Sequence, residues 1–319
     1  MSEQTIPFEQ VIARGCGIDV HKKIIVATIR GLDIVEETRE FDSFTSSIEN
    51  LKTWLLTNKI THVAMESTGV YWKPIFNIFE NDFEIVLVNA RHIKNVPGHK
   101  TDKKDSKWIT KLLLSGLLKA SFIPPKPIRQ LRDLTRYRRK VVSQIASEKN
   151  RIQKILEDAN IKLSSVISSM SGVAATKIIS DIINGNDDVE HLINYHSKKM
   201  KATKEELASS LNGHLTDHHR YMLNIVKKSM ESKQQIISDL DARINKQMEE
   251  FGLDSDVTLL QTIPGVGKDS ASGIIAEIGV NMSQFPDEHH LASWAGMSPG
   301  TNESAGKKKV LGQRMGIIT

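Results

Sequence analysis

The chain has 319 residues, of which 39% are hydrophobic and 25% are charged, a composition typical of a globular protein with two or three domains. No run of about 18 apolar residues occurs, so no membrane-spanning helix is predicted. The single cysteine, Cys16, excludes an internal disulfide and a cysteine-rich zinc site, and the N-terminus has no signal-peptide pattern, so we expect a cytoplasmic protein. The net charge of +5 comes from clustered basic residues, which favours a polyanionic partner.

The first part of the chain alternates between predicted strands and helices. Residues 11–30 have the apolar, β-branched composition of two strands joined by a short polar turn. A helix is predicted at 46–58, a short strand at 62–66, a second helix from Tyr71 and a further strand at 84–89. This order predicts an α/β domain in which helices cover one sheet.

Two acids lie where predicted strands end. Asp19 comes near the end of the first strand, and Glu66 closes the strand that follows the first helix. An acid beside a buried strand costs desolvation energy unless it is paired or binds a cation. The plain alternatives are a turn-forming role for Asp19 and an ordinary surface position for Glu66.

Two further acids, Asp102 and Asp105, lie three residues apart at the start of the next predicted helix. Residues at this spacing share a helix face, and the helix N-terminus favours their ionised form. A local helix cap is the plain alternative. With Asp19 and Glu66 they would form a carboxylate cluster that suits Mg²⁺ and two-metal phosphoryl transfer. Basic residues that would attract phosphates surround this stretch, among them Lys100 and Lys103.

Prolines at 121–128 predict a domain boundary. The predicted domains are 1–124, 125–251 and 252–319, with an irregular insertion at 164–216. A long helix is predicted at 129–163, with an apolar stripe and a basic remainder that has few acids nearby in the sequence. This pattern favours phosphate contacts over a merely solvated charged face. The residues predicted to make these contacts are Arg129, Arg132, Arg136, Arg138, Arg139 and Lys140.

A second long helix is predicted at 218–250. Apolar residues recur at every seventh position from Leu223 to Phe251, although Lys233 and Gln247 make the heptad pattern imperfect. We therefore expect the two long helices to form an antiparallel coiled-coil arm or a dimerisation element.

The last segment carries two basic, glycine-containing stretches. Pro264, Gly265 and Gly267 form the turn pattern of a helix-hairpin-helix, whose backbone amides approach DNA phosphates, and Lys268 favours that interpretation over an ordinary interhelical turn. Further on, Ser304 precedes a run of lysines. By itself this second stretch is typical of a flexible basic loop.

Seven segments of the chain together resemble the DEDD transposases of the insertion-sequence-110 family. They are GIDVHK at 17–22, AMESTGVYW at 64–72, HKTDKKD at 99–105, LRDLTRYRRKVV at 131–142, KNRIQKIL at 149–156, QTIPGVG at 261–267 and SWAGMSPGTNESAGKKK at 293–309. The resemblance implies an α/β RNase H-like (RuvC-like) N-terminal domain. It further implies a mainly helical coiled-coil arm and an α-helical C-terminal transposase domain with a helix-hairpin-helix-like turn.

The resemblance also implies a reaction. The family's four acids fall on Asp19, Glu66, Asp102 and Asp105, which would bind Mg²⁺ or Mn²⁺, and its serine nucleophile falls on Ser304. The implied activity is cleavage and exchange of DNA strands, at element ends and target, through a covalent phosphoserine. Lysines implied to contact nucleic acid follow the serine at Lys307 and Lys308.

The implied partners are DNA, a structured guide RNA and further copies of the chain in a homodimer or tetramer, in a bacterial or archaeal cell near the nucleoid. Family members continue well beyond the serine, so we expect a C-terminally truncated copy with an incomplete last domain. Two alternatives remain. The chain could be an inactive remnant that only binds nucleic acid, or a RuvC-like nuclease in which the serine plays no part.

Overall fold

The chain divides into two compact units, Met1–Ile123 and Pro124–Thr319. No helix among the described residues is long and apolar enough to cross a membrane. The computed structural model describes residues 11–67, 69–89, 105–118, 120–198 and 200–297, and the backbone alone of 301–304 and 307–310.

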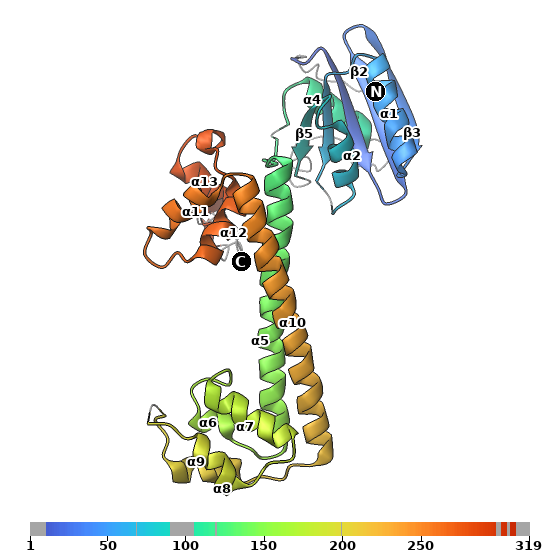
Figure 1. The fold of residues 1–319 in the computed structure, drawn as a ribbon. Coiled ribbons are helices and arrows are strands. Elements are labelled where there is room, and N and C mark those ends of the chain that lie inside the picture. The colour runs from blue at the N-terminus through green and yellow to red at the C-terminus, as the bar shows by residue number, and fades with distance from the viewer. Residues whose placement is uncertain are drawn as a thin grey trace. The chain divides into compact units, whose positions relative to one another are not determined.

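The first unit is built on a five-stranded mixed sheet of order β3-β2-β1-β4-β5 (Figure 1). Strands β1, β2 and β3 run antiparallel, whereas β1, β4 and β5 run parallel to one another. The strands are β1 (Arg14–Val20), β2 (Ile24–Gly31), β3 (Ile34–Asp42), β4 (His62–Glu66) and β5 (Glu84–Val88), and the helices are α1 (Thr45–Thr57), α2 (Trp72–Phe79) and α4 (Asp105–Leu114).

Apolar side chains cover both faces of this sheet. Because successive residues of a strand point to opposite faces, Cys16 and Ile18 of β1 pack into the core beneath α1 and α2. On the other face, Ala64 of β4 packs with Ile109 and Leu113 of α4. The sheet is therefore a central layer between two helical layers, as predicted for an α/β domain.

Strand β3 was not among the predicted strands. Its sequence, IVEETREFD, is largely charged, and most of its residues are exposed because it lies at the edge of the sheet. An edge strand with charged side chains lacks the apolar alternation on which the strand prediction depends. With β3 included, the mixed sheet is compatible with the expected RNase H-like domain.

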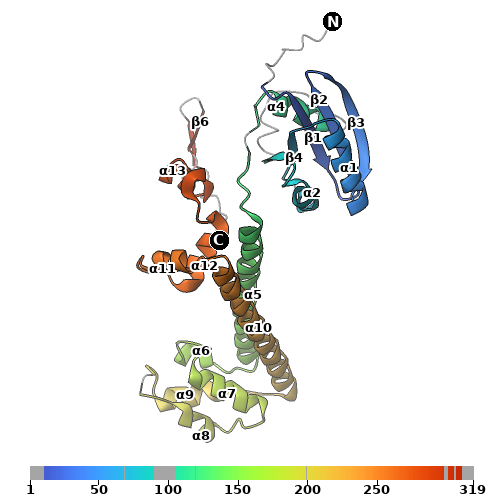
Figure 2. The ribbon, with the colours of Figure 1, turned by 45° about the horizontal axis from the view of Figure 1, so that its top comes forward.

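The second unit is mostly helical (Figure 2). Its elements are α5 (Lys126–Asp158), α6 (Leu163–Val166), α7 (Val173–Ile183), α8 (Val189–Leu192), η2 (Ile193–Tyr195), α9 (Lys204–Leu211), α10 (Asp217–Glu250), α11 (Asp254–Gln261), α12 (Lys268–Ile278), η3 (Met282–Gln284), α13 (Glu288–Trp294), β6 (Thr301–Ser304) and β7 (Lys307–Val310).

Helices α5 and α10 pack along each other in opposite directions. Gln247 near the end of α10 bonds Gln130 near the start of α5, and His219 at the start of α10 bonds Asp158 at the end of α5. The heptad positions Leu223, Ile237 and Ile244 are buried in this contact. The apolar seam of α10 thus packs within its own chain.

Two hydrophobic clusters hold smaller helices at either end of this helix pair. One joins Ile152 and Leu156 of α5 to the short helices between α5 and α10. The other combines Leu131 of α5 and Met248 of α10 with Ile275 of α12, and so takes residues from both sides of the predicted 251/252 boundary.

Candidate functional site

Glu66 is the last residue of β4, and Asp19 is the last but one of the neighbouring parallel strand β1. In the register of β1 and β4, Ile18 lies opposite Met65, so the next residues of the two strands are the two acids. Since parallel strands in register present equivalent positions to one face, both acids lie on the side of the sheet that carries α4. The carboxyl ends of parallel strands are the usual place for a ligand site in an α/β sheet.

Helix α4 brings Asp105 to the same end of the sheet. A Cβ on Gly15 would meet the side chains of Leu113 and Leu114 near the end of α4, whereas a Cβ on Gly17 would meet the backbone of Ser106 and Thr110 near its start. Helix α4 therefore runs antiparallel to β1. Its first residue, Asp105, lies toward the strand end that carries Asp19.

The donor chemistry of these acids fits a hard divalent cation, because Mg²⁺ takes carboxylate oxygens and commonly uses only one or two of them. The Asp19 side chain is 16% exposed, and its Oδ2 lies 3.0 Å from Nε2 of His21. Among the described residues, no three His, Cys, Asp or Glu side chains form a group that could hold a metal ion. Asp102, the fourth predicted ligand, lies outside the described residues, as do Lys100 and Lys103.

Three arginines of α5 that were predicted to contact phosphates make ion pairs within the chain. Arg136 donates from Nε and Nη2 to both carboxylate oxygens of Glu277 at 2.7 Å, and Arg132 Nε lies 3.2 Å from the same carboxylate. Glu277 belongs to α12, and its side chain is only 2% exposed. These contacts attach α12 to α5.

The surroundings of Arg132 and Arg136 shift their pKa values in opposite directions. Burial lowers the pKa of Arg132, whereas the hydrogen bond to Glu277 raises the pKa of Arg136. Arg138 pairs with Asp241 of α10 and lies 2.8 Å from Asp269 of α12, and its hydrogen bond to Asp241 raises its pKa. All three guanidinium groups thus neutralise acids of the same chain.

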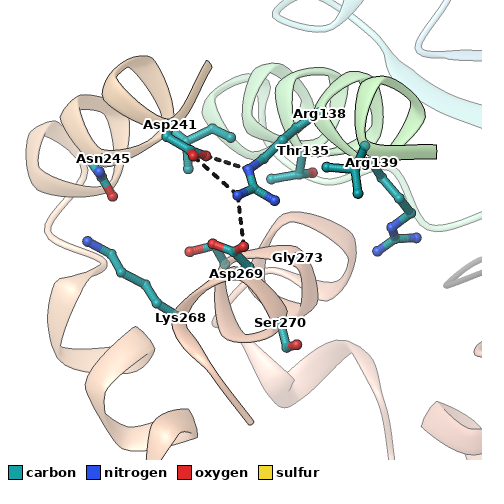
Figure 3. A pocket seen from close by; sticks show the side chains of 12 residues that line it. Thr135, Arg138, Arg139, Asp241, Asn245, Lys268, Asp269, Ser270 and Gly273 are labelled. Atoms are coloured by element: carbon teal, nitrogen blue, oxygen red, sulfur yellow. Dashed lines mark hydrogen bonds and ion pairs between the residues drawn. The ribbon is translucent and has the colours of Figure 1, made fainter. Parts of the chain in front are cut away.

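A polar pocket lies where α5, α10 and α12 meet (Figure 3). The Arg138 guanidinium points toward Asp241 and Asp269, and the side chains of Lys268 and Arg139 lie on either side of it (Figure 3). Arg139 and Lys140 of α5 are exposed, whereas Arg129 donates to the carbonyl of Pro124.

The predicted hairpin forms an exposed turn before α12. Gly265 has φ +86°, a conformation that favours glycine. Gly267 is the N-cap of α12, and nothing lies within 4 Å of where its Cβ would be. The N-terminus of an eleven-residue helix therefore opens to solvent beside Lys268, which suits a phosphate group.

Ser304 and the lysines after it lie in a two-stranded antiparallel sheet rather than in a flexible loop. The backbone of β6 pairs with that of β7, with Ser304 opposite Lys307 and Glu303 opposite Lys308.

Sequence reasoning missed the acids that pair with the α5 arginines. It considered only acids close in sequence, but Glu277 is 141 residues from Arg136, and Asp241 is 103 residues from Arg138. One signal was available, because Glu277 interrupts the apolar helix segment GIIAEIG. A carboxylate inside such a segment needs a buried cationic partner.

Two family matches cover more than half of the chain. Residues 16–161 match a transposase family named for the DEDD transposases of IS110. Residues 257–316 match the family described as Transposase IS116/IS110/IS902 family. No curated protein matches the sequence. The first match contains the acids of the sheet, and the second contains the hairpin and Ser304, so the chain belongs to the IS110 family of transposases and is a DNA transposase/recombinase.

Proposed function

We propose that the chain cleaves and exchanges DNA strands in a reaction that depends on Mg²⁺ and uses Ser304 as the nucleophile. The observation that supports this proposal is the register of β1 and β4, which puts Asp19 and Glu66 at equivalent positions on the face that carries α4, while α4 begins with Asp105 toward the same end of the sheet. The family matches supply the reaction class, and the sequence resemblance supplies the role of Ser304.

The acids would act by holding a cation that supplies positive charge to the reacting phosphate oxygens. Asp19 and Glu66 are oriented by adjacent strands, and the helix N-terminus beside Asp105 favours its ionised form. Nε2 of His21 lies 3.0 Å from Oδ2 of Asp19, and this ion pair would restrain the orientation of the carboxylate when the imidazole is charged. Asp102, which precedes α4, is proposed as the fourth ligand.

The proposed chemistry begins with attack of the Ser304 hydroxyl on the scissile phosphorus. A bond forms between Oγ and phosphorus while the bond to the bridging DNA oxygen breaks, and the leaving oxygen takes a proton as the serine loses one. A hydroxyl of the partner DNA strand then attacks the phosphoserine, so that a new phosphodiester forms and the serine is restored. The backbone sheet β6–β7 supports this role, because strands present a side chain more reproducibly than a loop.

Nucleic-acid contacts are proposed for the exposed cations and the hairpin. The backbone amides at Gly265 and Gly267 would approach phosphates, with Lys268 and Arg139 alongside. Lys140 of α5 and the lysines at 100, 103, 307 and 308 would add to this binding, which we propose includes a structured guide RNA. A homodimer or tetramer would use outer faces of the helix pair, because the α10 seam is occupied by α5.

A trapping assay tests the proposal. Labelled DNA carrying the element junction is incubated with the matching RNA, Mg²⁺ and the full chain, and the products are separated on a denaturing gel. We expect labelled DNA to stay on the protein, and this adduct to be lost in Ser304→Ala. DNA binding without any adduct would support a binding remnant, and cleavage that survives Ser304→Ala would support a RuvC-like nuclease.

A further inference from the structure

The contact between α4 and the sheet contains buried hydroxyl groups. Thr28 of β2, Ser106 and Thr110 of α4 are at most 2% exposed, although most of the core around them is apolar. A buried hydroxyl costs free energy unless it is hydrogen-bonded. These hydroxyls are therefore tolerated at this contact only if they have hydrogen-bond partners.

The three hydroxyls make hydrogen bonds across three elements, two of them to each other and the third to backbone groups. The Oγ1 atom of Thr28 lies 2.8 Å from Oγ of Ser106, and the Gly17 amide of β1 donates to Oγ1 of Thr110 at 2.9 Å. Thr110 Oγ1 also lies 2.6 Å from the Ser106 carbonyl and 3.0 Å from the Thr28 carbonyl. A hydroxyl has a single hydrogen, so it donates to one of these carbonyls at a time.

Thr28 extends the network to the edge of the sheet. Its Oγ1 lies 2.9 Å from Oγ1 of Thr38 on β3. The four hydroxyls thus connect β3, β2 and β1 to the first two turns of α4.

The backbones approach closely at the same point. A Cβ on Gly17 would lie 2.4 Å from both the Ser106 carbonyl oxygen and the Thr110 nitrogen. Apolar packing is not directional, whereas hydrogen bonds fix both a distance and an angle. Apolar packing alone would allow α4 to shift along β1. The hydrogen bonds of the hydroxyls therefore fix the position of the first turn of α4 relative to β1.

This first turn begins with Asp105, the residue before Ser106. We propose that Thr28, Ser106 and Thr110 are positioning residues, which hold the Asp105 carboxylate in place relative to Asp19 and Glu66. The inference rests on the proposed function, because the position of Asp105 matters for the reaction only if the three acids bind a cation together. Mutation of a group that orients a metal ligand without touching the metal commonly lowers metal affinity by about 10- to 100-fold.

The test compares two changes at Thr110. Thr110→Val keeps the shape of the side chain and removes the hydroxyl, whereas Thr110→Ser keeps the hydroxyl. Thr53→Val is the matched control, because Thr53 is exposed on α1 and makes only a local bond to the Glu49 carbonyl at 3.0 Å. Each variant is made in the full chain and studied by calorimetric titration with Mg²⁺, by DNA binding and by single-turnover cleavage.

For Thr110→Val we expect Mg²⁺ affinity to fall about tenfold and the cleavage rate at saturating DNA to fall about 10- to 100-fold. DNA affinity should stay unchanged. Thr110→Ser, which keeps the hydroxyl, should show neither the loss of Mg²⁺ affinity nor the loss of rate. A Thr110→Val chain that is less stable but keeps wild-type Mg²⁺ affinity and rate would overturn the inference. Should Thr110→Val fail to fold, Ser106→Ala gives the same comparison, since it removes the bond to Thr28 while sparing the Gly17 amide.

Asp19→Asn separates this inference from the proposed function. If Asp19→Asn abolishes Mg²⁺ binding while the hydroxyl variants keep it, the positioning role is wrong and the cation site stands. If Asp19→Asn also binds Mg²⁺ like the wild type, the cation site itself is wrong, and the positioning role is overturned with it.

Discussion

Acids in the two units of this chain have opposite surroundings. In the helical unit, Glu277 is buried between two arginines that neutralise it. In the sheet unit, Asp19 and Glu66 end adjacent strands on one face and remain partly exposed. The Glu277 carboxylate is held by guanidinium groups in the interior, whereas the Asp19 carboxylate lies 3.0 Å from the exposed side chain of His21 and keeps contact with solvent. The first arrangement stabilises the packing of α12 on α5, and the second leaves carboxylate groups accessible at the edge of the sheet.

The largest expected effect comes from Glu66→Gln, which removes one charge from the strand-end acids. We expect single-turnover DNA cleavage with Mg²⁺ and the matching RNA to fall at least about 100-fold, because charge stabilisation dominates phosphoryl transfer. The fold should persist, since Glu66 is partly exposed. Glu49→Gln is the control, because it makes the same chemical change at an exposed position of α1. Equal rates for both variants would mean that the strand-end acids are not catalytic.

The second prediction concerns the contact that brings α4 to these acids. Gly17→Ala would place a Cβ against the α4 backbone, so we expect the sheet unit to lose at least about 3 kcal/mol of stability. Gly15→Ala would meet the ends of two leucine side chains at 3.0 Å, which can shift, and the His62 carbonyl oxygen at an ordinary 3.6 Å, so it should cost less. Urea unfolding followed by tryptophan fluorescence measures both, because Trp54, Trp72 and Trp108 lie in this unit. A smaller loss for Gly17→Ala than for Gly15→Ala would contradict the close backbone approach.

The positions of the acids could be predicted from the sequence in the sheet unit, whereas the ion pairs of the helical unit could not. The strand-end position of Asp19 and Glu66 follows from local patterns, because an apolar strand and the acid that ends it are neighbours in the chain. The convergence of these two acids on one face also follows once the strands are parallel and in register. Strand β3 could not be predicted in this way, since a charged edge strand carries no apolar period.

The partners of the α5 arginines depend on packing between distant segments. Arg132, Arg136 and Arg138 form a basic cluster that looks suited to phosphates when only neighbouring residues are considered. Their acids come from α10 and α12, and only the antiparallel pairing of α5 with α10 and the docking of α12 bring them together. The charge pattern along α5 therefore predicts the basic cluster but not the internal ion pairs that its members make, and the phosphate contacts of these arginines stay a prediction.

The third prediction breaks the internal pairing directly. Glu277→Gln keeps the side-chain shape but removes its charge, so that Arg132 and Arg136 lose their counter-ion. We expect a loss of about 2 kcal/mol, the usual contribution of hydrogen bonds to a charged group. Hydrogen exchange of the peptide covering α12 should accelerate accordingly, while peptides of the sheet unit stay unchanged. Glu288→Gln, whose side chain is 85% exposed, is the matched control, and equal protection in both variants would show that the ion pairs do not hold α12.

The smallest expected effect concerns Asp181 in the short helices between α5 and α10. Its carboxylate accepts from the Tyr195 hydroxyl at 2.7 Å and lies 2.8 Å from His191 Nε2, and these bonds hold its pKa below the usual 3.8. A lowered acid pKa stabilises the fold above pH about 4, and that stability is lost as the pH falls through the lowered value. Tyr195→Phe removes the larger cause, so the variant should unfold at a lower temperature than wild type near pH 7.

That difference should shrink as the pH falls below 4, because Asp181 then becomes protonated in both proteins and the charge no longer contributes. Thermal unfolding measured from pH 7 to pH 3 tests this, with Tyr221→Phe as the control at a tyrosine that is 63% exposed on α10. A difference independent of pH would mean that Tyr195 acts by packing alone. In that case the charge of Asp181 would contribute nothing to the stability of the fold, unlike the charge of Glu277, although both carboxylates have hydrogen-bond partners.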